Sequence, residues 1–132
     1  MMLYQIEIIK FRYLLLYIML KVTAEKIDRV IILHFEGDFF IDQLNNVDKL
    51  WKEQLACSPR VIALDCSKID HVDSSAISTL VKYLNEAMNK NIRLIFYDLH
   101  PSVQKLFEIA RLQRFFNITT REKFEKKFLK SA

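Results

Sequence analysis

The chain of 132 residues contains a single glycine, Gly37. This scarcity excludes two classes of site, because phosphate-cradling loops and the nucleophile elbow of hydrolases both need several glycines for their tight backbone turns. The segment 72–76, Val-Asp-Ser-Ser-Ala, has a central serine but lacks both glycines of such an elbow. We therefore expect neither a glycine-rich nucleotide site nor a serine hydrolase.

Cysteine is almost as scarce. The two cysteines, Cys57 and Cys66, have neither CxxC spacing nor nearby histidine partners. A disulfide framework and a structural zinc site both need more such residues at closer spacing. We therefore expect two reduced, partly buried thiols in a cytoplasmic protein, with no metal ion held by cysteine. With the lack of a glycine-rich loop, we also expect no cofactor.

Long apolar runs are also missing. Residues 1–18 are rich in apolar side chains, but charged residues interrupt them, and the unbroken apolar run 13–20 has only eight residues. A membrane-spanning helix needs about 20, and no small-residue cleavage site of a signal peptide follows. We expect no membrane insertion. Residues 1–18 are then an N-terminal extension, either packed on the domain or upstream of the functional start, and residues 19–132 form the domain.

The net charge of +4 is modest and lies mainly in the C-terminal third, where residues 100–132 hold eight Lys or Arg and three Asp or Glu. Acidic and basic residues alternate there, and Glu122 can pair with Lys126 one helical turn later. Nucleic-acid binding needs a concentrated basic face with base-reading side chains. The pattern therefore predicts a solvated C-terminal helix and no nucleic-acid partner.

Apolar periodicity predicts alternating strands and helices. Short apolar or alternating runs predict strands at 20–24, 30–35, 61–66, 91–97 and 116–119. A helical period predicts helices within 39–55, 74–88, 101–110 and 121–130. This order is typical of an α/β fold with a mixed sheet of about four to five strands covered by about four helices.

The central stretch 61–84 combines a buried strand, a short acidic loop and a helix that begins at two serines, Ser74 and Ser75. The helix N-cap is either Asp73 or Ser74, because either side chain can accept a hydrogen bond from a free amide of the first turn. Two hydroxyl groups are thus predicted at the positive end of a helix, at the rim of the sheet.

Two segments carry a resemblance to a known family: LDCSKIDHVDSSAISTL at 64–80 and HPSVQKLFEIARLQRFFNI at 100–118. With the order of elements, they resemble the STAS domain of bacterial anti-sigma factor antagonists, from about Met19 to the C-terminus. In that family a partner kinase phosphorylates the first serine after the aspartate at the helix start. The resemblance places this role on Ser74, with Asp73 before it and Ser75 after it. It also implies a STAS-like sandwich fold.

Three positions depart from the family pattern. Ala76 stands where the family has a glycine after the serine pair, and Arg111 stands where glycine is frequent. The acidic residue usual after the second strand falls near Phe40, with Asp38 and Asp42 on either side. These departures leave the expected fold unchanged and bear on the identity of the partner.

The resemblance implies a non-enzymatic binding protein. Unphosphorylated, it would bind an anti-sigma factor serine kinase; phosphorylated on Ser74, it would release that kinase, and a serine phosphatase would reset it. The residues expected to contact the partner are Asp38, Asp42, Asp73, Ser74, Ser75 and Lys82.

Two other functions stay open at this point. The first is a STAS scaffold subunit, of a lipid transporter or a stress-signalling complex, in which Ser74 serves only as a helix cap. The second is a small ligand- or metal-binding enzyme that uses the carboxylates of Asp65, Asp70 and Asp73 as oxygen ligands.

Overall fold

The computed structural model describes residues 20–40 and 44–129, so residues 1–18 and Asp42 lie outside the described residues. Five strands form one sheet: β1 (Lys21–Ile27), β2 (Val30–Phe39), β3 (Val61–Val72), β4 (Arg93–Tyr97) and β5 (Asn117–Thr119). The helices are α2 (Asn45–Ala56), α3 (Ser74–Asn89), α4 (Pro101–Ile109) and α5 (Arg121–Phe124), which continues as the π-helical turn η2 (Glu125–Leu129). The predicted α/β fold is confirmed.

The sheet has the order β1-β2-β3-β4-β5 and is mixed. β1 pairs antiparallel with β2, and the other three neighbouring pairs are parallel. Each parallel pair is joined through one helix, because parallel neighbours need a crossover connection. The starts of α3 and α4 therefore follow the carboxyl ends of β3 and β4, at one edge of the sheet.

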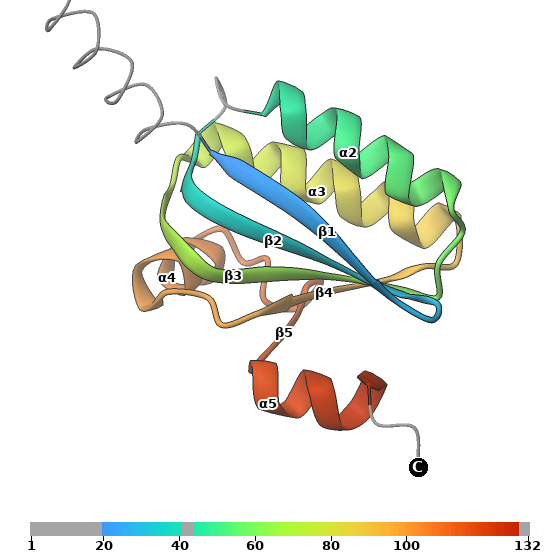
Figure 1. The fold of residues 1–132 in the computed structure, drawn as a ribbon. Helices are drawn as coiled ribbons and strands as arrows, with labels where there is room; N and C mark the ends of the chain where they lie inside the picture. The colour runs from blue at the N-terminus through green and yellow to red at the C-terminus, as the bar shows by residue number, and fades with distance from the viewer. Residues whose placement is uncertain (1–19, 41–43, 130–132) are drawn as a thin grey trace, which may run out of the picture.

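The two faces of the sheet are covered unequally (Figure 1). α2 and α3 cover one face, and α5 lies against the other. Alternate strand residues point to opposite faces, so two apolar clusters form. The larger includes Trp51 and Tyr83 between α2 and α3, and Phe107 of α4. The smaller gathers strand residues such as Val30 and Ile95 around Phe124 of α5.

The prediction of a short acidic loop after the central strand is wrong. β3 continues to Val72 and stays paired with β2, and two register shifts accommodate the extra residues of β3. Such bulges leave one strand a residue longer than its partner, which breaks the simple alternation of apolar and polar residues. Ile69 and Val72 nevertheless keep buried side chains, so this segment belongs to the sheet.

Two further side chains differ from expectation. Met88 continues the helical spacing of the apolar residues Leu80 and Leu84, which predicts an inward side chain, but it is 63% exposed. Ala87 takes the inward position, because it lies three whole turns after Ala76 on the buried side of α3. Cys57 was predicted to be partly buried and is exposed, since it follows the last residue of α2; Cys66 is a buried free thiol, as expected.

Candidate functional site

The start of α3 holds the two serines singled out by the sequence. Asp73 has an extended backbone, and its Oδ1 accepts a hydrogen bond from the Ala76 amide at 2.7 Å. Of the two candidates for the N-cap, the structure thus selects Asp73. Ser74 is the first helical residue, and the side chains of Ser74 and Ser75 are exposed. The Ser74 hydroxyl is therefore accessible at the helix start while Asp73 performs the capping.

Ala76 replaces the glycine of the related pattern, and its place in the helix shows what this change does. The residue is 0% exposed and belongs to the large apolar cluster. Its methyl group therefore points into the core rather than onto the surface beside Ser74. The alanine leaves the accessible surface around the serines unobstructed.

Neighbouring elements meet at the same edge of the sheet. The Asp73 amide donates to the Phe39 carbonyl at 3.3 Å, which ties the helix start to the end of β2. The Ser102 hydroxyl donates to the Asp70 carbonyl at 3.3 Å, which ties the start of α4 to β3. His100 caps α4, as its helix-entry position predicts, by accepting from the Ser102 amide. These links bring the ends of β2 and β3 and the starts of α3 and α4 together at the carboxyl ends of the parallel strands.

The remaining predicted contact residues are placed differently. Asp38 is half-buried and lies next to Phe39 near the end of β2, on the side of the helix start. Lys82 is exposed two turns along α3 and pairs with Glu86 at 3.8 Å. Asp42 lies outside the described residues. Asp38 thus precedes the residue that is tied to the helix start, and Lys82 lies farther along the helix.

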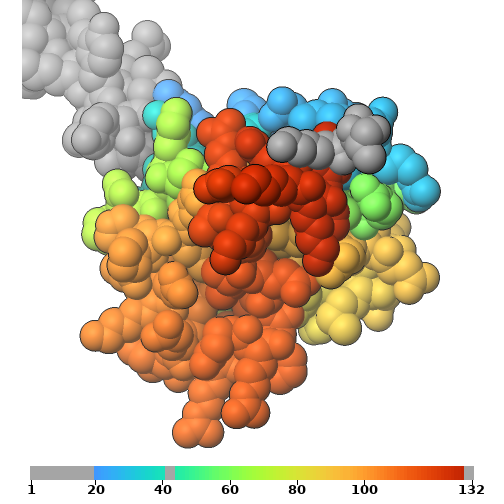
Figure 2. Space-filling view, turned by 90° about the horizontal axis from the view of Figure 1, so that it is seen from below, coloured from blue at the N-terminus to red at the C-terminus, as the bar shows by residue number. Residues whose placement is uncertain are grey.

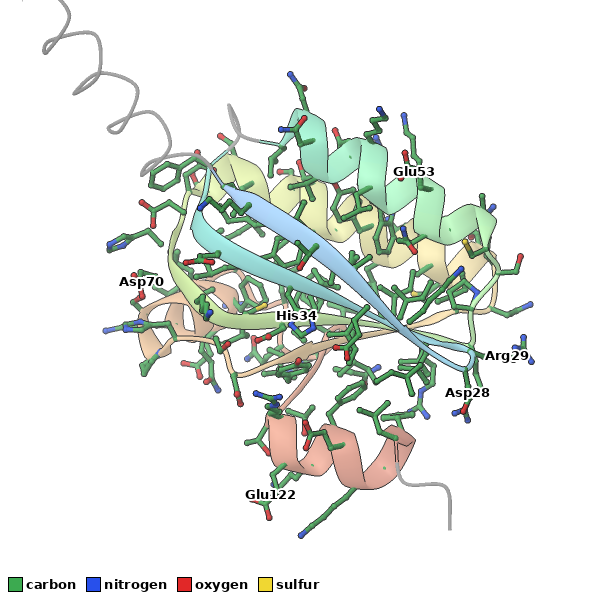
Figure 3. All side chains as sticks on the ribbon, in the orientation of Figure 1. Asp28, Arg29, His34, Glu53, Asp70 and Glu122 are labelled. Carbon is green, nitrogen blue, oxygen red and sulfur yellow. The ribbon has the colours of Figure 1, made fainter. Side chains whose placement is uncertain are left out.

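The acidic residues considered as metal ligands are used separately. Asp70 is exposed at the edge near α4 (Figure 3), and Asp73 caps α3. Asp65 lies farther back along β3, where its Oδ1 accepts hydrogen bonds from the Ser67 hydroxyl and amide. In the described ranges 20–40 and 44–129, no group of three or more His, Cys, Asp or Glu is arranged to hold a metal ion.

His34 lies on the central part of the sheet (Figure 3), and its side chain joins three strands. Its Nδ1 lies 2.7 Å from Oδ2 of Asp65 on β3, and its Nε2 lies 2.9 Å from Oε1 of Glu25 on β1. Partial burial alone would lower the pKa of His34, but hydrogen bonds to both carboxylates and their charges raise it. Burial likewise opposes ionisation of Asp65, yet Ser67 and His34 hold the pKa of Asp65 below its usual value.

From the sequence alone, His34 in its apolar strand is predicted to be a core or rim histidine with hydrogen-bond partners. The structure confirms the rim position, because the side chain is partly exposed and has two partners. The network itself was missed. Its members are 9 and 31 residues away from His34 in the chain. Strand pairing brings both carboxylates within reach of His34. Asp65 is its direct partner on β3, and Glu25 lies two residues from its direct partner on β1, Thr23.

A second missed contact holds α3 against α2. Trp51 stacks on Tyr83 with ring centroids 4.5 Å apart, and its indole N–H donates to Glu86 at 2.8 Å. The Tyr83 hydroxyl donates to Asp48, and burial, together with that carboxylate, raises the pKa of Tyr83. By helical period alone Glu86 falls on the polar face of α3, so the sequence does not indicate its contact with Trp51. These contacts give the serine helix a rigid support.

None of the helices in the described part of the chain has the length and apolar character needed to span a bilayer.

Comparisons with known proteins agree with this architecture. A model of the STAS domain family matches residues 21–126. An anti-sigma factor antagonist from Mycobacterium paratuberculosis superposes with a TM-score of 0.71 at 13% identity, over 84% of this chain and 95% of that one. The Bacillus cell fate determinant SpoIIAA in its phosphorylated form gives 0.64 at 15% identity, over 81% and 98%.

A chain from the stressosome, a signal integration and transduction hub, gives a TM-score of 0.61 at 18% identity, over 80% of this chain and 94% of that one. No curated protein matches the sequence. At identities this low, the superpositions establish a shared fold.

Proposed function

Because the chain belongs to the STAS domain family, we propose that it is a non-enzymatic anti-sigma factor antagonist whose partner binding is switched by phosphorylation of Ser74. One observation carries the proposal: the Ser74 hydroxyl is exposed at the first position of α3 while Asp73 supplies the cap. The fold shared with an antagonist and with a protein solved in phosphorylated form supports it.

A phosphate on Ser74 suits the local structure of this domain. It adds about 1.5 to 2 negative charges at pH 7 and three strong acceptor oxygens. Free amides and the dipole at a helix N-terminus stabilise such a charge by roughly 0.3–1 kcal/mol. Because Asp73 already caps the helix, the modification leaves the cap in place. The domain therefore stays folded in both states.

The same charge opposes a partner that covers the helix start. Leaving a buried charge unpaired costs on the order of 3–5 kcal/mol, which weakens binding by a factor of about 100 or more. Asp70, exposed at the same edge, adds repulsion. Phosphate thus acts as a release signal for an anti-sigma factor serine kinase, and a serine phosphatase restores binding in the cytoplasm.

The partner would cover the surface around the start of α3. On this proposal, the kinase contacts the helix start, the end of β2 and the outer side of α3, and the contact residues are Asp38, Asp42, Asp73, Ser74, Ser75 and Lys82. Lys82→Glu should then weaken the kinase complex. Lys126→Glu, on the far side of the sheet, serves as the matched control and should leave affinity unchanged.

Mass spectrometry after incubation with ATP and the cognate kinase tests the proposal directly. We expect one phosphate, on Ser74, in the wild type and in Ser75→Ala, and none in Ser74→Ala. Phosphate on Ser75 alone, or on neither serine, would contradict the assignment.

A scaffold subunit of a stress-signalling complex is the second candidate, favoured by the fold shared with the stressosome chain. A pull-down separates the two. The antagonist should retain a kinase in a one-to-one complex that dissociates on phosphorylation, whereas the scaffold should retain a large assembly that does not depend on Ser74.

A further inference from the structure

A groove lies beside the edge strand β5, where α5 and η2 cover the sheet. It has a volume of about 400 Å³ and runs between the edge of the sheet and the segment formed by α5 and η2. Figure 2 looks onto this segment from below the sheet. The apolar lining includes Phe116, Ile118, Phe124 and Phe128. Apolar pockets of roughly 300–1,000 Å³ with a few polar groups are typical of small-molecule sites.

The charged residues of this groove all have the same sign. Arg93, Lys123 and Lys127 line it, and no carboxylate does. The two acids of the segment pair elsewhere: Glu122 with Lys126 at 3.1 Å and Glu125 with Arg121 at 2.9 Å. Glu122 points away from the sheet in Figure 3.

The charges of the α5 and η2 segment are therefore divided between the side that faces the groove and the outer side. Lys123 and Lys127 lie four residues apart and share the groove side of the helix, while the lysine that pairs with Glu122 does not line the groove. In the sequence, the alternating charges predict only a solvated helix. In the structure, the unpaired lysines line the groove, and the paired charges lie outside it.

The aromatic wall is held in position by its neighbours. Phe124 is buried and stacks on Tyr97 with ring centroids 5.3 Å apart. The guanidinium of Arg93 lies 5.4 Å from the centre of the Phe128 ring, and the ammonium of Lys127 lies 5.5 Å from it, within the range of cation–π attraction. Phe128 belongs to the π-helical turn, a rare geometry that occurs often at functional sites.

We propose that this groove binds a small organic anion, a carboxylate on an aromatic or aliphatic body. The body would pack on Phe128 beside the edge strand β5, and the carboxylate would accept hydrogen bonds from Lys123 and Lys127. Charge complementarity selects this occupant, because the lining offers three cations and no acid. The site is separated from Ser74 by the sheet, so it is independent of the phosphorylation switch.

An NMR titration of the full chain with 2-naphthoate tests the proposal. We expect saturable amide shifts at residues 93, 116–119 and 123–128, and binding of neutral 2-naphthamide that is about tenfold weaker, the equivalent of one charge-assisted contact. The double variant Lys123→Gln/Lys127→Gln should weaken 2-naphthoate binding by about tenfold or more. Lys126→Gln, outside the groove, should bind as the wild type does.

Three results would overturn the proposal. Equal binding of 2-naphthoate and 2-naphthamide would show an apolar groove without anion selectivity. Shifts scattered over the surface, or no saturation, would show unspecific adsorption. Shifts that follow protein concentration rather than ligand would identify the groove as an interface between two copies. Because all three substituted lysines are exposed, wild-type unfolding temperatures in every variant confirm that the comparison is between folded proteins.

Discussion

The two faces of the sheet differ in how completely helices cover them and in the kind of contacts they make. On one face, α2, α3 and α4 bury a continuous apolar cluster, and aromatic stacking fixes the helix that presents Ser74. Among the described residues, α5 and η2 are the helical segments on the other face (Figure 1). Phe124 is the one fully buried residue of these two segments. The packed face holds its helices through apolar contacts, whereas the other face also carries the Glu25–His34–Asp65 contacts between three strands.

The difference matters for function because the two kinds of contact respond to different signals. A close-packed face resists deformation, so a charge added at the rim of the packed face changes binding rather than fold. Partly solvated ion pairs such as Glu25–His34–Asp65 respond to protons. The comparison therefore predicts a rigid presenting surface on one side and pH-sensitive contacts on the other.

The largest effect is expected for Trp51→Ala on the packed face. The change removes the stack on Tyr83 and the hydrogen bond to Glu86, and we expect a loss of about 3–5 kcal/mol in the free energy of unfolding. Urea denaturation measures it. Phe124→Ala is the matched change on the other face and should cost less global stability, because α5 can open locally while the rest stays folded. Equal losses would remove the distinction between the faces.

The next effect concerns partner binding without a change of fold. Phosphorylation of Ser74 should weaken the kinase complex by about 100-fold or more, and Ser74→Asp should weaken it less, because a carboxylate has about half the charge. Ser74→Ala should bind as the wild type does, since Asp73 is the cap. Calorimetric affinities and thermal unfolding of each form provide the test. A phosphoprotein that unfolds at a much lower temperature would mean that the switch acts through the fold.

A smaller effect, on the partly covered face, is a dependence of stability on pH. The folded pKa of His34 is raised above 6.5, so its stabilising contribution is full below that pH and is lost as pH rises through the folded value. Because the pairs are partly exposed, we expect a loss of about 1 kcal/mol or less. Urea unfolding between pH 6 and 9 should show this slope in the wild type and not in His34→Gln.

His71→Gln provides the control for that experiment, because His71 is an exposed histidine outside the network. It should keep the wild-type dependence on pH. Identical slopes for the wild type and His34→Gln would show that the three-strand network contributes no stability. A slope of opposite sign would mean that folding lowers the pKa of His34 rather than raising it.

The smallest effect is expected at the N-terminus. Residues 1–18 precede the region matched by the family model and lie outside the described residues. A chain that starts at Met19 should unfold with nearly unchanged free energy. A loss of more than about 2 kcal/mol, a large part of the stability of a typical domain, would show that these residues complete one of the two faces.

Local pattern was enough to predict most of the architecture. Helix α3 was recognisable because its apolar period and its Asp-Ser start act within a few residues, and α4 because Pro101 suits a first helical turn. The order of strands and helices also predicted a mixed sheet, and with the segments 64–80 and 100–118 it carried the resemblance to the STAS domain; both are confirmed. These features depend on interactions between residues close in the chain.

Only the tertiary structure decided the features that depend on distant residues. The bulges that lengthen β3 arise from its pairing with β2, and the choice of Asp73 over Ser74 as cap depends on how β3 enters the helix. The contacts of His34 and the groove beside Phe128 exist because strand register and helix packing bring separate segments together. The period of apolar residues indicates which side of a helix or strand is buried, because burial depends on neighbours within that element. Side-chain partners on other strands are determined only when the whole chain packs.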